Sequence, residues 1–153
     1  VKVMEELLKP AKQALDEGRI RSIRLSTRPD CITPEILRLL KRYGVKTVEL
    51  GVQSLDPQVL KKAERGHTAE DARQAAALLR QNDFSVGLQF MIGLPGEDWK
   101  SMRYTARQGV RLKPDFIRIY PVLVLEGTAL GKMYRAGTYR LSGWKRQYVR
   151  PPL

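Results

Sequence analysis

The sequence predicts an α/β protein in which four parallel strands alternate with helices. Short runs rich in β-branched and other apolar residues recur along the chain, and segments with apolar residues at helical spacing separate them. The length of 153 residues suits one domain with a single core. Such a chain forms either an open sheet or an arc of a βα barrel, and both bind ligands beyond the carboxyl ends of the strands.

The first two helices and the strand between them are predicted as follows. Gly18 follows the last turn of the first helix, and Pro10 either kinks this helix or begins its second half. A strand is predicted over residues 20–25. Thr33 caps the second helix, which ends before Gly44. The apolar positions of the first helix are Met4, Leu7, Leu8, Ala11 and Leu15.

The rest of the chain continues the same alternation. A strand is predicted over residues 45–52, and Asp56 begins a short helix that ends at Gly66. Thr68 begins a helix whose apolar face is mostly alanine, so this helix can lie close to a sheet. The remaining predicted elements are a strand over 84–92, a helix from Asp98 to about 112, a strand over 116–120 and a helix over 129–136.

Composition excludes several classes of protein. Apolar residues make up 42% of the chain and charged residues 29%, and no apolar run approaches the roughly 18 residues that cross a bilayer. Cys31 is the only cysteine, so an internal disulfide framework is excluded. With no secretory signal at the start, we expect a cytoplasmic protein without a membrane partner. One thiol also cannot supply the several thiolates of a zinc or iron–sulfur site.

The net charge is the first indication of a partner. The chain has 28 basic and 16 acidic residues, a net charge of +12, which favours polyanions such as nucleic acid. Part of this charge lies in residues 140–153, which contain four basic and no acidic residues. Most other basic residues occupy polar positions of helical patterns, which is also typical of solvated helix faces.

Polar residues gather where the predicted strands end. Gln53 ends an otherwise apolar strand, and its amide needs a partner, either a bound ligand or a neighbouring loop. Residues 93–97, with two glycines around Leu94 and Pro95, either approach a phosphate or an adenine or form an ordinary turn. His67 stands without a second histidine or nearby thiol, which favours loop packing over metal binding. The other polar residues at these ends are Ser26, Arg28, Asp30, Gln89, Arg118 and Tyr120.

Six short segments together resemble the radical S-adenosylmethionine (radical SAM) superfamily. The pattern is most similar to the Elongator catalytic-subunit branch and, more distantly, to the oxygen-independent coproporphyrinogen oxidases. The resemblance covers residues 20–139 and implies a partial βα barrel in which the four strands are the last four of six units, with helices on the outer face. The segments are Ser-Thr-Arg-Pro-Asp at 26–30, Gly-Val-Gln-Ser at 51–54, Arg-Gly-His-Thr at 65–68, Gly-Leu-Pro at 93–95, Arg-Ile-Tyr-Pro at 118–121 and Leu-Glu-Gly-Thr at 125–128.

The resemblance also implies cofactor-binding residues. Gln53 is similar to the amide that contacts S-adenosylmethionine, and Arg65 to the arginine that reaches the methionine carboxylate. Gln89 is similar to the polar residue that faces the nucleoside, and Ser26 stands where relatives often hold a glutamate for the ribose. Residues 91–95, which include Met91 and Gly93, are similar to the backbone that borders the adenine. Arg28, Asp30, Arg118 and Tyr120 are candidates to face the substrate, and no catalytic residue is assigned.

Two elements of the family pattern are missing from the sequence. The CxxxCxxC loop, which holds the 4Fe-4S cluster, is absent, as is the acetyl-transfer domain of Elongator-like proteins. We therefore expect residues 1–139 to be an incomplete half-barrel that is inactive alone and meets the cluster on a separate amino-terminal half. We also expect a disordered basic tail over 140–153 and oligomerisation through the open sheet edge. The parent enzyme is expected to modify tRNA.

Two other functions remain open at this point. A non-enzymatic RNA-binding module would use Arg28, Arg118 and the basic tail to neutralise phosphates. An ordinary α/β enzyme would bind a phosphate at residues 93–97.

Overall fold

The computed structural model describes residues 2–140 and 148–149. Its centre is a sheet of four parallel strands in the order β1-β2-β3-β4, so each strand pairs with the one that follows it in sequence. The predicted α/β class and the four parallel strands are confirmed. The strands are β1 (Ile23–Thr27), β2 (Val45–Gln53), β3 (Ser85–Ile92) and β4 (Phe116–Pro121).

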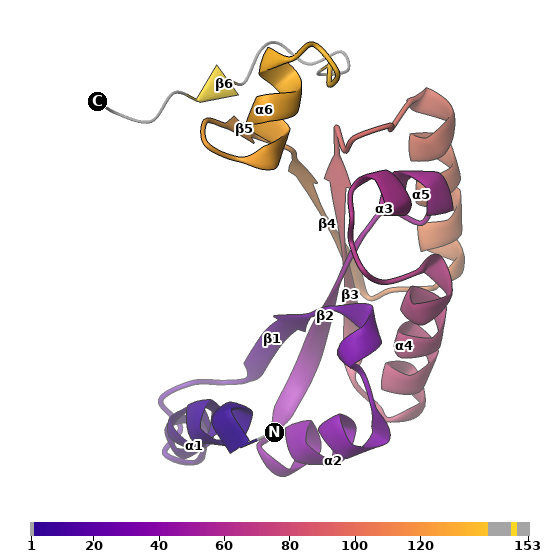
Figure 1. Cartoon of the computed structure of the whole chain (residues 1–153). Coiled ribbons are helices and arrows are strands. Elements are labelled where there is room, and N and C mark those ends of the chain that lie inside the picture. The colour runs from indigo at the N-terminus through magenta and orange to yellow at the C-terminus, as the bar shows by residue number, and fades with distance from the viewer. Residues whose placement is uncertain (1, 141–147, 150–153) are drawn as a thin grey trace.

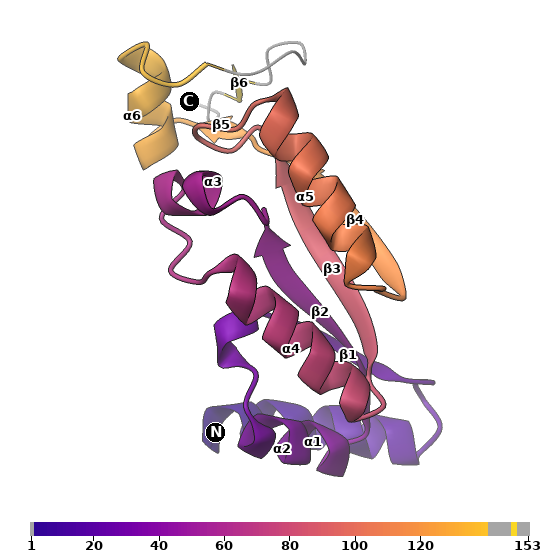
Figure 2. The same ribbon diagram turned by 90° about the vertical axis from the view of Figure 1, so that its right-hand side faces the viewer.

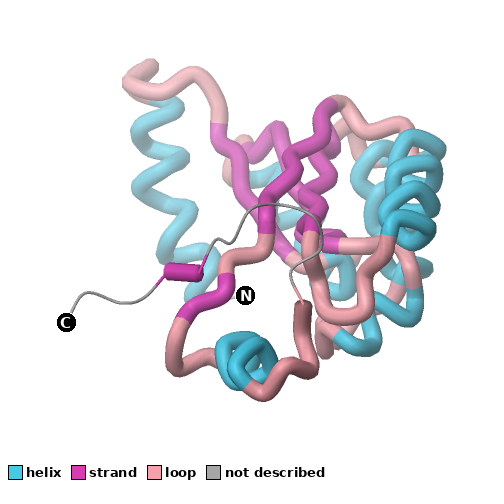
Figure 3. The backbone as a smooth tube through the Cα atoms, turned by 90° about the horizontal axis from the view of Figure 1, so that it is seen from above, coloured by secondary structure: helices cyan, strands magenta, loops and turns pink. Residues whose placement is uncertain are grey.

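The helices lie mainly on one side of this sheet (Figure 1, Figure 2). α4 (Ala69–Gln81) and α5 (Trp99–Arg111) run along its outer face. α1 (Lys2–Asp16) and α2 (Pro34–Arg42) lie near the amino ends of the strands, whereas α3 (Pro57–Lys62) lies near their carboxyl ends. The view from above shows the strands beside the helices of the outer face, α4 and α5 (Figure 3).

The carboxyl ends of the strands also carry the last described elements. α6 (Ala129–Arg135) stands above these ends, next to a short parallel pair that the sequence did not predict (Figure 1). Between α1 below and α6 above, the inner face of the sheet carries no helix in the described part of the chain. This inner face is therefore the surface on which a ligand can lie. The short pair consists of β5 (Val124–Leu125) and β6 (Tyr148–Val149).

Helix boundaries follow the capping residues that the sequence provides. The Thr33 side chain accepts a hydrogen bond from the Ile36 amide at the start of α2. Thr68 with Asp71, and Asp98 with Ser101, form reciprocal capping boxes that begin α4 and α5. α1 contains Pro10 within a single helix, and α3 ends at Lys62, before the predicted end at Gly66.

The core lies between the outer face of the sheet and the helices. Side chains of β2 and β3 that point outward are fully or almost fully buried, and they pack against α4. The predicted alanine face of α4 is buried as well, which lets the helix approach the strands closely. The most deeply buried members of this layer are Val48, Leu50, Val52, Val86, Leu88, Ala72 and Leu79.

Three further predictions concern the tail, membrane-spanning helices and the first strand. The tail prediction falls on residues 140–153, of which 141–147 and 150–153 lie outside the described residues. In the described ranges, no helix combines the length and the apolar character needed to cross a membrane. The first strand begins at Ile23 rather than at residue 20, so it is shifted toward its polar carboxyl end.

Replacing a core leucine tests this packing. Leu88 is 0% exposed in the middle of β3, whereas Leu7 on α1 is 71% exposed. We expect Leu88→Ala to lower the free energy of unfolding by about 2–5 kcal/mol, because it removes buried methyl groups and leaves a cavity. The matched change Leu7→Ala should cost less than about 0.5 kcal/mol. Urea denaturation measures both, and equal costs would contradict the described core.

Candidate functional site

Two glycines form the floor of the inner face. A Cβ atom at Gly87 on β3 would lie 2.2 Å from the ring of Phe116 on β4. A Cβ atom at Gly51 on β2 would lie 2.9 Å from the side-chain nitrogen of Gln53. Larger side chains therefore fold down over both glycines, and they bring aromatic and amide groups close to the sheet.

A buried carboxylate lies at the centre of this face. Glu49 on β2 is only 2% exposed, and its oxygens accept hydrogen bonds from Arg118 Nη1 on β4 at 3.1 and 3.3 Å. On β1, Arg24 Nη2 lies 3.8 Å from the same carboxylate and the Ser26 hydroxyl donates to it at 3.4 Å. A carboxylate this deeply buried requires such partners. Sequence reasoning missed Glu49, although a lone acid within an apolar strand was the available signal.

Aromatic rings lie beside both arginines. The Arg118 guanidinium carbon lies 4.8 Å from the centre of the Tyr120 ring, and that of Arg24 lies 5.6 Å from the Phe116 ring. Both are cation–π distances. The structure thus brings together Arg118 and Tyr120, which the sequence placed at the end of the same strand. Arg118 is held by Glu49, so it is not a free cation for a phosphate.

The two predicted glutamines meet at the carboxyl end of the sheet. Gln89 Nε2 on β3 donates to Gln53 Oε1 on β2 at 3.0 Å, and Gln53 is only 5% exposed. The Gln53 backbone has φ 66°, and the Ser54 amide donates to the Val52 carbonyl at 2.8 Å. A two-residue hydrogen bond around a positive φ is the rare, strained form of the γ-turn. This strained turn ends β2 where the glutamine pair lies.

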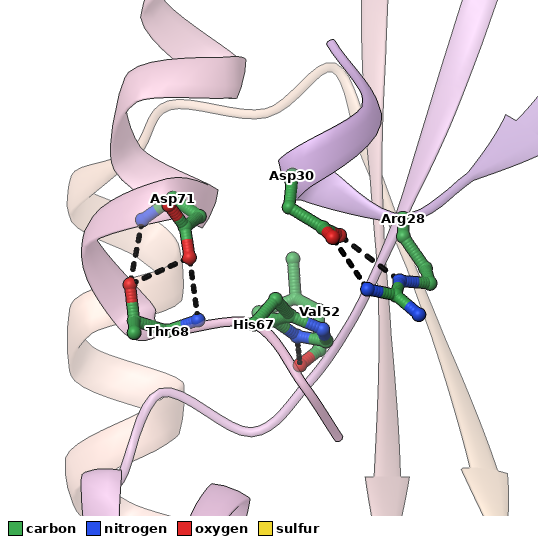
Figure 4. Close-up of polar contacts among 6 residues, drawn as sticks. All are labelled: Arg28, Asp30, Val52, His67, Thr68 and Asp71. Atoms are coloured by element: carbon green, nitrogen blue, oxygen red, sulfur yellow. Dashed lines mark hydrogen bonds and ion pairs between the residues drawn. The ribbon is translucent and has the colours of Figure 1, made fainter.

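The His67 side chain contacts this turn. Its Nε2 lies 3.1 Å from the Val52 carbonyl oxygen, and because a carbonyl only accepts, Nε2 carries the proton (Figure 4). Nδ1 is buried and has no hydrogen-bond partner among the described residues. The contact agrees with the interpretation of His67 as a loop-packing residue. In the described ranges, no three His, Cys, Asp or Glu side chains gather as a metal site would need.

Arg28 and Asp30 form a pair above His67 (Figure 4). The Arg28 guanidinium donates to both carboxylate oxygens, through Nε at 3.0 Å and through Nη2. This hydrogen bonding lowers the pKa of Asp30, and the carboxylate in turn raises the pKa of Arg28. Arg28 is therefore committed to Asp30, and its expected role in neutralising phosphates is not supported by this geometry.

Two side chains already bind the backbone of the loop after β3. The Gly93 amide donates to Glu97 Oε2 at 2.5 Å, and the Gly93 carbonyl accepts from the Tyr139 hydroxyl. A phosphate at this amide would displace a carboxylate and would meet its negative charge. The structure therefore argues against the phosphate-binding enzyme as a function of residues 93–97. Met91 packs here against a small apolar cluster that includes Leu94 and Val122.

Arg65 lies in the loop between α3 and α4, two residues before His67. Its amide donates to the Leu60 carbonyl at 3.2 Å, which fixes the backbone. The side-chain Nε is buried, yet it has no hydrogen-bond partner in the described part of the chain. A buried guanidinium donor without an acceptor is costly, and a ligand carboxylate would satisfy it.

Fold and site together define a class. An arc of parallel strands, helices on its outer face and polar side chains at the carboxyl ends are the features of a ligand-binding βα-barrel core. A family model for the radical SAM superfamily matches residues 2–108, and one for the radical SAM C-terminal domain matches residues 114–150. The chain belongs to the radical SAM superfamily. The second match extends to residue 150, beyond residue 139, where the resemblance in the sequence motifs ends.

Individual relatives agree with this family. The chain is 40% identical over 128 residues to the tRNA uridine(34) acetyltransferase of Methanocaldococcus jannaschii, covering 81% of this chain and 24% of that protein. The solved Elp3 of Methanocaldococcus infernus, with an N-terminal deletion, shares 36% identity and a TM-score of 0.70 over 78% of this chain and 29% of that one. The chain thus spans about a quarter of the length of such relatives.

A third similar protein comes from another branch, the oxygen-independent coproporphyrinogen oxidases. Coproporphyrinogen III oxidase (HemN) from Escherichia coli has a TM-score of 0.67 and 20% identity, covering 78% of this chain and 29% of that one. Both branches named from the sequence motifs are therefore found among the similar proteins. At this identity the likeness to HemN concerns the fold alone.

The buried carboxylate predicts an asymmetry between two substitutions. Arg118→Met leaves a buried Glu49 charge with only weaker partners, so we expect it to lower the free energy of unfolding by about 3–5 kcal/mol. Glu49→Gln leaves arginines that are partly exposed and that water can solvate, so it should cost less than about 2 kcal/mol. Denaturant titrations of both variants and of the double variant measure the difference. A larger cost for Glu49→Gln would contradict this account.

Glu97 predicts a pH dependence of stability. Burial raises the pKa of its carboxyl, the Gly93 and Leu94 amides oppose this, and Asp56 and Asp98 add to it. The folded state therefore binds the proton more tightly than the unfolded state, and the ionised carboxylate destabilises the fold. The stability of the wild type relative to Glu97→Gln should rise as pH falls from neutral to about 4, the ordinary range of a carboxyl. Unfolding curves at several pH values test this, and a relative stability that falls with acidification would refute it.

Proposed function

We propose that this chain forms the side of a radical SAM core that binds the nucleoside and methionine parts of S-adenosylmethionine. The observation that carries the proposal is the buried Nε of Arg65, which has no partner among the described residues. The methionine carboxylate of the cofactor would accept from this donor. Membership in the superfamily supports the choice of this cofactor over other carboxylates.

The glutamine pair supports the position of the nucleoside. Gln53 and Gln89 use one donor and one acceptor on each other, and the described contacts leave Gln53 Nε2 and Gln89 Oε1 without a hydrogen bond. These two groups offer a donor and an acceptor side by side, which suits a ribose hydroxyl or an adenine edge. Ser26 keeps its place in the proposal at the ribose, and Met91 and Gly93 at the adenine.

The residues present do not fit an iron–sulfur cluster. The sequence contains one cysteine, Cys31, which is exposed, whereas the family cluster needs several thiolates. We propose that a separate amino-terminal half provides the cluster, and that the chain is inactive without it. The free edge of β1, which pairs only with β2 in the described sheet, is the place where such a half, or a second copy of the chain, would add strands.

The parent enzyme would act on tRNA. This part of the proposal rests on the similarity to proteins named tRNA uridine(34) acetyltransferase and on the net charge of +12. We also propose a cytoplasmic location for the parent enzyme, and we assign no catalytic residue. Asp30 and Tyr120 remain candidates to face the substrate, alongside the paired Arg28 and Arg118.

Nuclear magnetic resonance of the labelled chain tests the cofactor site. Methionine alone should shift the Arg65 Nε–H signal, and adenosine alone should shift the side-chain amide signals of Gln53 and Gln89. S-adenosylmethionine should shift all of them with a dissociation constant of about 1 mM or weaker, because few contacts offset the entropy of association.

Arginine variants provide the control for this titration. Arg65→Ala should abolish the response to methionine and keep the response to adenosine. Arg73→Ala, which removes a partly exposed arginine paired with Glu70, should leave both responses unchanged. If methionine shifts no signal near residue 65 in the wild type, or if Arg65→Ala responds normally, the assignment of Arg65 is wrong.

A further inference from the structure

One face of α5 carries a row of cations that the cofactor site does not use. The row, here called the basic stripe, consists of Lys100, Arg103, Arg107 and Arg111, all exposed. Their spacing of three and four residues places them on one side of the helix, over about 16 Å at 1.5 Å per residue. Together with Trp99, Tyr104 and Gln108, they line a groove of about 360 Å³.

The three arginines of the basic stripe differ from most other arginines of the sheet and its loops. Arg24, Arg28 and Arg118 each lie against a carboxylate. Among the described residues, no ion pair or hydrogen bond involves the side chains of the three stripe arginines, and Lys100 lies near Asp98. Like charges at positions i and i+4 destabilise a helix, so the fold gains nothing from this arrangement. A bound polyanion would relieve the repulsion.

Aromatic side chains lie within the same groove. Trp99, the first residue of α5, is 70% exposed, and Tyr104, which follows Arg103, is 39% exposed. Exposed aromatic rings between cations are the arrangement on which unpaired bases stack while phosphates meet the charges.

A membrane surface fits this helix less well. A helix that lies on a membrane inserts an apolar face opposite its charged face. In α5 the face opposite the basic stripe holds Ser101, Thr105 and Gly109, which are buried against the rest of the protein. This face is not available for lipid, so α5 cannot insert the side opposite the basic stripe into a membrane.

We infer that the basic stripe is a docking surface for single-stranded RNA, with phosphates on the arginines and bases on Trp99 and Tyr104. The inference rests on the RNA partner of the proposed function, and it moves the contact away from Arg28 and Arg118, which are paired. The RNA segment that binds to α5 would therefore lie outside the reacting centre. The cofactor site and the docking surface lie on different faces of the sheet.

Fluorescence anisotropy with a labelled single-stranded RNA of about 15 nucleotides tests the surface. The triple variant Arg103→Gln, Arg107→Gln, Arg111→Gln should bind about 100-fold more weakly at about 0.1 M salt. Each phosphate contact on a single strand contributes about 0.7 to the slope of log affinity against log salt, so three contacts change the slope by about 2. Trp99→Ala should weaken binding by about 5- to 150-fold through lost stacking.

A matched control carries the same loss of charge elsewhere. Arg21→Gln, Arg38→Gln, Lys61→Gln removes three exposed cations outside the stripe and should change affinity less than about threefold. Equal weakening of the control and the stripe variant would overturn the inference, as would binding of the wild type to anionic lipid vesicles but not to RNA. Circular dichroism should show all variants folded, since the glutamines remove repulsion within the helix.

The cofactor titration separates this inference from the proposed function. The stripe variant should keep the adenosine and methionine responses of the wild type, because α5 presents the stripe away from the inner face. RNA binding that survives in the stripe variant overturns the docking surface and leaves the cofactor proposal standing. A wild type that binds no RNA overturns both the surface and the tRNA partner, while the cofactor site is still judged by its own titration.

Discussion

The ion pair between Glu49 on β2 and Arg118 on β4 holds the polar face of the sheet together. It reaches across β3, whose Gly87 lies beside Glu49 in the register and leaves space on this face. With Arg24 on β1 at the same carboxylate, groups from three of the four strands meet at one buried charge. A sheet with no helix on its inner face has few other means to fix its polar side chains, so this cluster sets where they lie.

One of the non-glycine residues with positive φ, Gln53, lies where β2 ends at the site. The γ-turn at Gln53 is held by the His67 side chain from one side and by α5 from the other, where the Thr105 hydroxyl lies 3.0 Å from the Ser54 hydroxyl. The Leu55 amide also donates to Thr105, at 3.1 Å. Such a conformation persists only when its surroundings over-determine it, and these contacts meet that requirement.

The sequence was sufficient to predict the class, the four strands and the helix caps, because these depend on local patterns and on neighbouring residues. The glutamine pair was reached through family motifs, since nothing local requires Gln53 and Gln89 to touch. Glu49 was missed because its partners lie 25 and 69 positions away along the chain. For the same reason, no local pattern distinguishes Arg118, which is paired with the distant Glu49, from the unpaired arginines of α5.

The two cationic sites differ in how strongly water and salt weaken them. The Arg65 Nε is buried, so its attraction for a carboxylate is only weakly screened. The basic stripe faces solvent, where the screening length at physiological salt is about 8 Å, shorter than the stripe itself. In the two proposals, a small ligand would therefore gain its affinity from one desolvated contact, whereas a polyanion would have to engage several exposed cations together. Ionic strength consequently separates the two modes of binding in a single molecule, because only the second releases counterions in proportion to its contacts.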